Sequence, residues 1–133
     1  MPSYDINWLA VVVATVATQA LGALWYGPLF GKAWLRAVGK TREDMAGAGV
    51  GYAVAALSSL VAAIALALIL NLIPDPGLAE GIIWGLIVGV GFVATSGLTT
   101  SVFEEGRQAQ TVIFVAFQIV AFAIMGAILG AWR

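Results

Sequence analysis

Cysteine and histidine are both absent from the 133 residues of this chain. Without cysteine, the chain has no disulfide, no thiolate metal site and no cysteine nucleophile. Without histidine, it lacks the commonest metal ligand and the usual proton carrier near neutral pH. We therefore expect no cofactor and no metal ion, and any acid–base chemistry would use carboxylates, tyrosine, lysine or water.

Charged residues are also scarce, at 10% of the chain, whereas a soluble domain usually carries about a quarter. The hydrophobic fraction is 62%, and the mean hydropathy is +1.01. The apolar residues fall in blocks long enough to cross a bilayer, which takes roughly 20 residues of helix. The composition predicts an all-α integral membrane protein, a four-helix bundle in the lipid bilayer. The net charge of −1 gives no indication of a nucleic-acid partner.

The four apolar blocks predict a single transmembrane domain over residues 1–133. Its helices are expected at about 8–26, 45–73, 79–102 and 109–132. Between the first two, Lys32, Arg36 and Lys40 recur every fourth residue and so share one face of a helix. Residues 31–44 are therefore expected to include a short amphipathic helix on the membrane surface.

Local signals set the expected ends of these helices. Gly27 and Pro28 predict the end of the first helix, because proline cannot continue the backbone ladder without cost. Gly39 predicts the end of the surface helix. The pair Trp25 and Tyr26 marks a membrane interface, where amphipathic rings prefer to lie.

Lysine and arginine are unequally divided between the two sides of the expected bundle. Five of the six lie in the loops after the first and third helices, and only Arg133 lies on the opposite side. The positive-inside rule therefore predicts that these loops are cytoplasmic and that both termini are outside the cytoplasm. The expected location is the cell inner (plasma) membrane.

Pairs of glycines spaced four residues apart occur in three of the expected helices, and such pairs let helix backbones approach closely. The pairs are Gly47 and Gly51, Gly85 and Gly89, and Gly126 and Gly130. A ridge of small residues on the second helix consists of Ala55, Ser59, Ala63 and Ala67. Packing within the chain is the favoured interpretation, and the alternative is a seam between copies in a homo-oligomer.

The expected membrane interior is polar at a few positions but carries no charge at mid-membrane. A proton-coupled pump, which needs an ionisable relay there, is therefore disfavoured. For Gln19 and Gln118, a hydrogen bond between helices is favoured over the lining of a substrate cavity. A group of hydroxyls crowds the cytoplasmic half of the third helix: Thr95, Ser96, Thr99, Thr100 and Ser101. They suggest a wetted or partner-facing surface, although hydroxyls also bond to carbonyls of their own helix.

A cluster of charges precedes the fourth helix and consists of Glu104, Glu105 and Arg107. A solvated ion pair is the favoured interpretation, since exposed pairs contribute little to stability. The expected topology nevertheless places this cluster on the same side as Trp25 and Tyr26. Acids, an arginine, a tyrosine and aromatic rings together would form a small-ligand site with aromatic walls and polar anchors.

Four segments, which together extend over nearly the whole chain, carry a likeness to a known family. They are residues 6–8, 22–34, 103–107 and 126–132. The most specific part is the stretch Trp25-Tyr26-Gly27-Pro28. On these segments the chain resembles the bacterial membrane family called domain of unknown function 1761. The resemblance implies a four-helix membrane domain and carries no catalytic residue.

Three functions fit these observations, and a small transporter, channel or carrier of a small or lipophilic ligand is preferred. The ligand-binding candidates are Gln19, Trp25, Tyr26, Thr95, Thr99, Arg107 and Gln118. The second function is a membrane enzyme acting on a lipophilic substrate at the cytoplasmic face, with Glu104 or Glu105 as acid or base and Tyr26 as a further candidate. The third is an accessory subunit whose basic surface helix meets anionic lipid or a partner protein.

Overall fold

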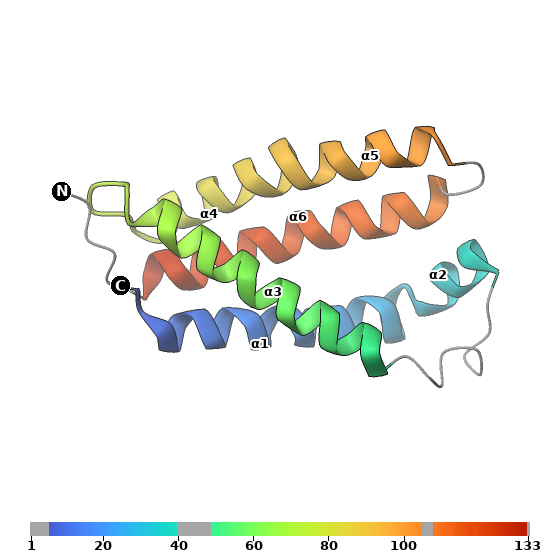
Figure 1. Ribbon diagram of the computed structural model, residues 1–133, viewed down its shortest axis with the longest axis horizontal. Coiled ribbons are helices and arrows are strands. Elements are labelled where there is room, and N and C mark those ends of the chain that lie inside the picture. Colours follow the sequence, from blue (N-terminus) through green and yellow to red (C-terminus); the bar gives the residue numbers. More distant parts are fainter. Residues whose placement is uncertain (1–5, 40–48, 105–107, 133) are drawn as a thin grey trace.

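The computed structural model describes residues 6–39, 49–104 and 108–132, which are almost entirely helical (Figure 1). The elements in chain order are α1 (Trp8–Leu24), the π-helical turn η1 (Trp25–Leu29), α2 (Gly31–Val38), α3 (Gly49–Leu70), α4 (Leu78–Val88), the π-helical turn η3 (Gly89–Ala94), α5 (Thr95–Val102) and α6 (Gln108–Ala131). Helix α1 continues directly into η1, and α4, η3 and α5 form one continuous helix, here called the third span.

Four helices in the described part of the chain are long and apolar enough to cross a membrane. They are Trp8–Leu29, Gly51–Leu70, Leu78–Val102 and Gln108–Ala131. The predicted all-α four-helix membrane bundle is therefore confirmed, and the chain is a multi-pass membrane protein. Its exposed surface is rich in large hydrophobic side chains, as expected for helices that face lipid.

The first span does not end where Gly27 and Pro28 were expected to stop it. Instead, η1 carries the helix on to Leu29, and the Phe30 N–H donates to the Trp25 carbonyl at 2.8 Å. Proline has no N–H, and its ring clashes with the carbonyl four residues back. A wider π turn carries the chain past this position without the usual hydrogen bond.

The second span is shorter at its end than the sequence pattern indicates. Helix α3 ends at Leu70 rather than at residue 73, and the N–H of Leu72 donates to the Ile69 carbonyl in a tighter turn. The chain then reverses at Asp75, whose φ is +45°. The expected beginning of this helix at residue 45 lies outside the described residues.

The helix predicted between the first two spans is present as α2. Helix α2 ends at Gly39, whose φ of +71° is the left-handed conformation that favours glycine. The predicted end signal is therefore confirmed. Residues 40–44, the rest of the polar connection, lie outside the described part.

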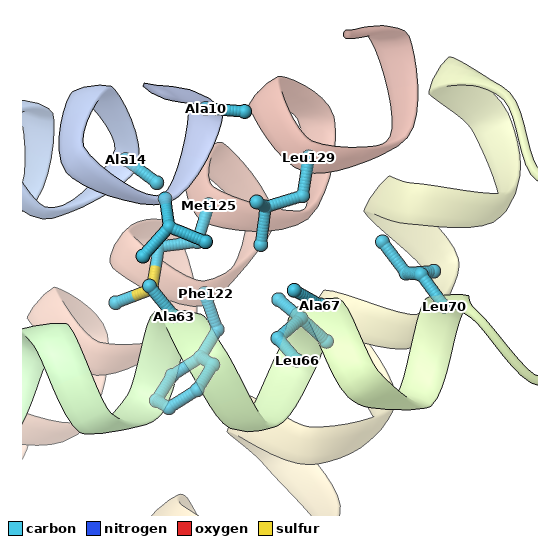
Figure 2. Close-up of a cluster of buried hydrophobic side chains, with 10 residues drawn as sticks. Ala10, Ala14, Ala63, Leu66, Ala67, Leu70, Phe122, Met125 and Leu129 are labelled. Carbon is cyan, nitrogen blue, oxygen red and sulfur yellow. The ribbon is translucent and has the colours of Figure 1, made fainter. Parts of the chain in front are cut away.

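Helix α6 is the central element of the bundle. It packs against α1, α3 and all three segments of the third span, and Figure 1 shows it between the third span and α1. The apolar core joins α1, α3 and α6 near the end that holds the chain termini (Figure 2). Its buried members are Ala10, Val11, Ala14, Ala63, Leu66, Ala67, Leu70, Phe122, Met125 and Leu129.

The closest helix pair is α4 with α6, and glycines on both helices make the approach possible. A methyl group at Gly81 would overlap the Gly126 carbonyl oxygen, and one at Gly85 would overlap the Phe122 carbonyl oxygen. A methyl group at Gly130 would lie 2.9 Å from the Gly81 Cα. The pairs at 85 and 89 and at 126 and 130 therefore serve packing within the chain, as favoured from the sequence.

The two ends of the bundle carry different elements. At one end, Asn7 caps α1 by accepting from the Ala10 N–H at 3.1 Å, and its amide donates to the Trp132 carbonyl at 3.1 Å. This side chain ties the beginning of the first span to the end of the fourth. Helix α2, the end of α5 and the beginning of α6 lie at the other end (Figure 1). The assignment of that end to the cytoplasm stays a prediction.

Candidate functional site

An aromatic cluster forms where η1 meets α2 and α6. Its members are Trp25, Tyr26, Phe30, Trp34 and Phe117. The Tyr26 ring stands edge-on to Trp34 at 5.7 Å and to Phe117 at 5.5 Å between ring centroids. Trp25 lies 4.8 Å from Phe30. These spacings are those of favourable aromatic pairs, so the rings largely pack against one another.

The π turn positions this cluster. It changes the direction in which Trp25 and Tyr26 leave the helix, so that both rings contact Phe117 on α6. The Trp25 indole N–H also donates to the Ile113 carbonyl at 3.1 Å, which satisfies its only polar atom. Single π turns within α-helices are frequent at functional sites. The aromatic cluster is therefore one half of the candidate site.

The other half is an uncharged polar bridge between the first and second spans. The Gln19 amide donates to the Ser59 hydroxyl at 2.9 Å and to the Ala55 carbonyl at 3.3 Å. The hydrogen bond between helices that the sequence favoured for Gln19 is thus confirmed. On the same helix, Thr18 is buried and donates back to the Ala14 carbonyl at 2.9 Å. Gln19 lies near the middle of its span and is only partly buried.

The second predicted amide lies elsewhere. Gln118 is partly buried on α6, beside η3, where a methyl group at Gly89 would lie 3.6 Å from the Gln118 carbonyl oxygen. Gln19, in contrast, bonds to α3. In the described part of the chain, no hydrogen bond joins the two amides, so the structure supports a polar bridge at Gln19 alone.

On α5, the hydroxyl-bearing side chains of Thr95 and Thr99 face outward rather than into the bundle. Thr95 and Thr99 are exposed, and their hydroxyls donate to carbonyls of their own helix at 3.0 and 2.9 Å. Ser101 is buried and donates to the Leu98 carbonyl at 2.8 Å. These hydroxyls are satisfied locally, and the structure does not bring Thr95 or Thr99 to Gln19.

The sequence did not reveal the second π turn, η3, in the middle of the third span. It covers Gly89–Ala94, and the Thr95 hydroxyl donates to both the Gly91 and the Phe92 carbonyls. On the outward side of the same helix there is an open apolar groove. The residues that line it are Ile83, Leu86, Ile87, Val90 and Gly91. The closely spaced Gly89 and Gly91 are the signal that could have indicated an irregular helix here.

Glu104 follows α5 at the end of the bundle that carries α2. Its N–H donates to the Ser101 carbonyl at 3.3 Å, and its carboxylate oxygen Oε2 is buried. Buried Ser101 lies on the preceding helix, and buried Thr111 lies on the helix that follows. Glu105 and Arg107 lie outside the described residues, so their predicted part in the charge cluster stays a prediction.

The aromatic cluster and α5 both pack on α6. Trp25 and Tyr26 contact Ile113 and Phe117. On α5, a methyl group at Gly97 would lie 3.4 Å from Val115. Ile113 and Val115 are two residues apart, which is about 200° around a helix. Gly97, in the first turn of α5, therefore lies over a different face of α6 from Trp25, and a site shared by Tyr26 and Glu104 stays a prediction.

The chemistry that this arrangement supports is that of an uncharged site. The described residues contain no group of His, Cys, Asp and Glu side chains that could hold a metal ion. Within the four described spans, Glu80 is the one aspartate, glutamate, lysine or arginine side chain, and it caps α4 by accepting from the Gly77 N–H. Amide, hydroxyl and aromatic groups can bind neutral or lipophilic molecules.

Comparison with known proteins gives a family and no further relative. No curated protein and no solved structure matches this chain. One family model matches residues 9–130, which include all four spans almost completely. The resemblance first noted around Trp25 and Pro28 is confirmed, and the chain belongs to the family described as protein of unknown function (DUF1761).

Proposed function

We propose that this chain is a channel-like carrier that moves a small neutral or lipophilic molecule across the membrane. The observation that carries the proposal is the polar bridge from Gln19 to Ser59 and the Ala55 carbonyl near mid-span. A polar group in hydrocarbon is costly unless it has a partner. The bridge satisfies one end of the Gln19 amide and leaves a partly exposed polar group where a solute crosses.

The lack of charge along the described spans supports a neutral or lipophilic cargo. An ion at the centre of a bilayer needs compensating charges or a set of oxygen ligands. The second and fourth described spans contain no Asp, Glu, Lys or Arg, and Glu80 in the third lies in the first turn of α4. Transport by this chain is therefore driven by the solute gradient rather than by proton coupling.

The two π turns supply the irregular helix segments that a carrier needs. Both η1 and η3 belong to spans that pack on α6. A π turn carries an extra residue within one turn, so a small shift of that residue rotates the helix on one side of it. Rotation at η1 would reorient the part of the first span that lies between η1 and the Gln19 bridge.

Solute flux tests the proposal. Proteoliposomes with the wild-type chain should equilibrate glycerol clearly faster than protein-free vesicles. Gln19→Leu should slow this flux roughly tenfold, because a hydrogen bond between membrane helices contributes about 1–2 kcal/mol. Thr100→Val is the matched control, since Thr100 is exposed and its hydroxyl donates to the Ser96 carbonyl within α5, and it should leave the flux unchanged.

Two outcomes contradict this proposal at different levels. If glycerol crosses no faster than in protein-free vesicles, the chain is not a carrier of this kind. If the wild type supports flux and Gln19→Leu does not change it, the pathway runs elsewhere in the bundle.

A membrane enzyme remains the second candidate because of one observation, the buried carboxylate oxygen of Glu104. A carboxyl group partly removed from water at the membrane face has the setting of a general acid. Glu104 would be the proton-transfer group of this second candidate, and a part for Tyr26 beside it stays a prediction.

Lipid turnover distinguishes this candidate. Nanodiscs made with a total lipid extract should yield a new lipid product with the wild type, seen by mass spectrometry. Glu104→Gln should lower its formation about 100-fold, the usual contribution of a general acid. Glu80→Gln, at the opposite end of the third span, is the control and should retain the activity. Equal amounts of product from Glu104→Gln and the wild type would contradict the role of Glu104 as a general acid.

A further inference from the structure

Helix α2 presents a fixed pair of cations at one end of the bundle. Lys32 and Arg36 are both exposed, and their spacing of four residues places them on one face of the helix. Trp34 and Leu35 are partly buried, and Gly31 is buried at the first turn. The helix therefore turns an apolar side toward the protein and a basic side away from it.

Contacts with the first and fourth spans hold α2 in this orientation. The Trp34 N–H donates to the Phe30 carbonyl at 2.8 Å, and the Trp34 ring packs edge-on against Tyr26. Helix α2 also packs against η1 and α6. The two cations thus have a set position relative to the membrane-spanning helices, unlike charges on a free loop.

The residues next to this basic pair are apolar and exposed. Leu29 is 61% exposed and Phe30 is 39% exposed, directly before α2. From Ile6 to Val38 the sequence contains no aspartate or glutamate. Apolar side chains beside cations, at the end of a membrane span, are the pattern of a helix that lies in the lipid interface.

We propose that Lys32 and Arg36 bind the phosphate groups of anionic phospholipids, while Leu29 and Phe30 enter the adjacent acyl-chain boundary. The occupant is the bilayer's own anionic lipid, because the cations lie where headgroups lie and the exposed apolar pair needs acyl chains beside it. Basic residues beside a membrane attract negatively charged lipid. The aromatic cluster then links lipid binding at α2 to the π turn in the first span.

Lipid binding by the purified whole chain tests this inference without any flux assay. In native mass spectrometry, the wild type should retain phosphatidylglycerol about tenfold more strongly than phosphatidylcholine. The double variant Lys32→Gln with Arg36→Gln should lose this preference. The charge-conserving variant Lys32→Arg with Arg36→Lys should keep it. Glycerol phosphate, which has the phosphate but no acyl chains, should not displace the bound lipid.

Other results would overturn the inference. Equal retention of the two lipids by the wild type would show that α2 does not select anionic lipid. Retained preference in the Gln double variant would place the lipid site elsewhere. Displacement by glycerol phosphate would show a soluble phosphate site in place of a lipid site. Thermal stability in phosphatidylcholine, measured for every variant, shows that each one is folded when its lipid preference is read.

Discussion

Gly81→Ala should destabilise the bundle by about 3 kcal/mol, as expected for an extra methyl group forced into a close-packed contact. The added methyl group would meet the Gly126 carbonyl oxygen and lie 3.0 Å from the Gly130 Cα. Both are backbone atoms of α6, so no side-chain rotation relieves the overlap and the third span must move away. Because the third span packs chiefly on α6, that movement affects the whole pair. Unfolding in sodium dodecyl sulfate, followed by tryptophan fluorescence, measures the change.

Gly51→Ala is the matched control for this experiment. Gly51 lies in α3, and a methyl group there has no neighbour within 4 Å. Alanine is a better helix former than glycine by about 1 kcal/mol, so this variant should be unchanged or slightly more stable. If Gly81→Ala unfolds like Gly51→Ala, the close approach of α4 and α6 is wrong.

Phe122→Ala should lower stability by about 2–3 kcal/mol. The Phe122 side chain is 7% exposed in the core that α6 shares with α1 and α3 (Figure 2). In soluble proteins such a change costs about 3–5 kcal/mol, part of it from lost transfer out of water. Separated membrane helices meet lipid rather than water. The expected loss is therefore smaller and comes from the cavity and the lost packing.

Phe92→Ala provides the comparison, because Phe92 is 67% exposed on the outer side of η3. Lipid fills the space that its ring leaves, so the unfolding midpoint should stay close to that of the wild type. Equal destabilisation by the two substitutions would mean that the core around Phe122 does not stabilise the bundle.

The spans could be predicted from the sequence because hydrocarbon thickness sets both their length and their polarity. The polar bridge at Gln19 was also predictable in kind, since a buried amide needs a partner. The identity of that partner, Ser59, depends on how α1 and α3 cross, and that crossing is not written in either helix alone.

The π turns are the features that the sequence pattern concealed. Pro28 predicts the end of a helix, whereas the backbone hydrogen bond from the Phe30 N–H to the Trp25 carbonyl shows that the helix continues through a π turn. The glycine contacts between α4 and α6 could be predicted only in part. The pairs at 85 and 89 and at 126 and 130 were recognised, whereas Gly81, which makes the closest approach, belongs to the same series of fourth residues and was missed.

The central place of α6 has a consequence for the order of biosynthesis. The ribosome produces the first three spans before this one, yet the third span has its main packing surface on α6. During translation, the third span therefore lies in the bilayer before α6 is present, with Gly81 and Gly85 facing lipid or the insertion machinery. The Asn7 amide also lacks its acceptor at that stage, because Trp132 follows the fourth span in the sequence. Assembly of this protein is therefore completed after insertion, when the fourth span enters the gap between helices already in place.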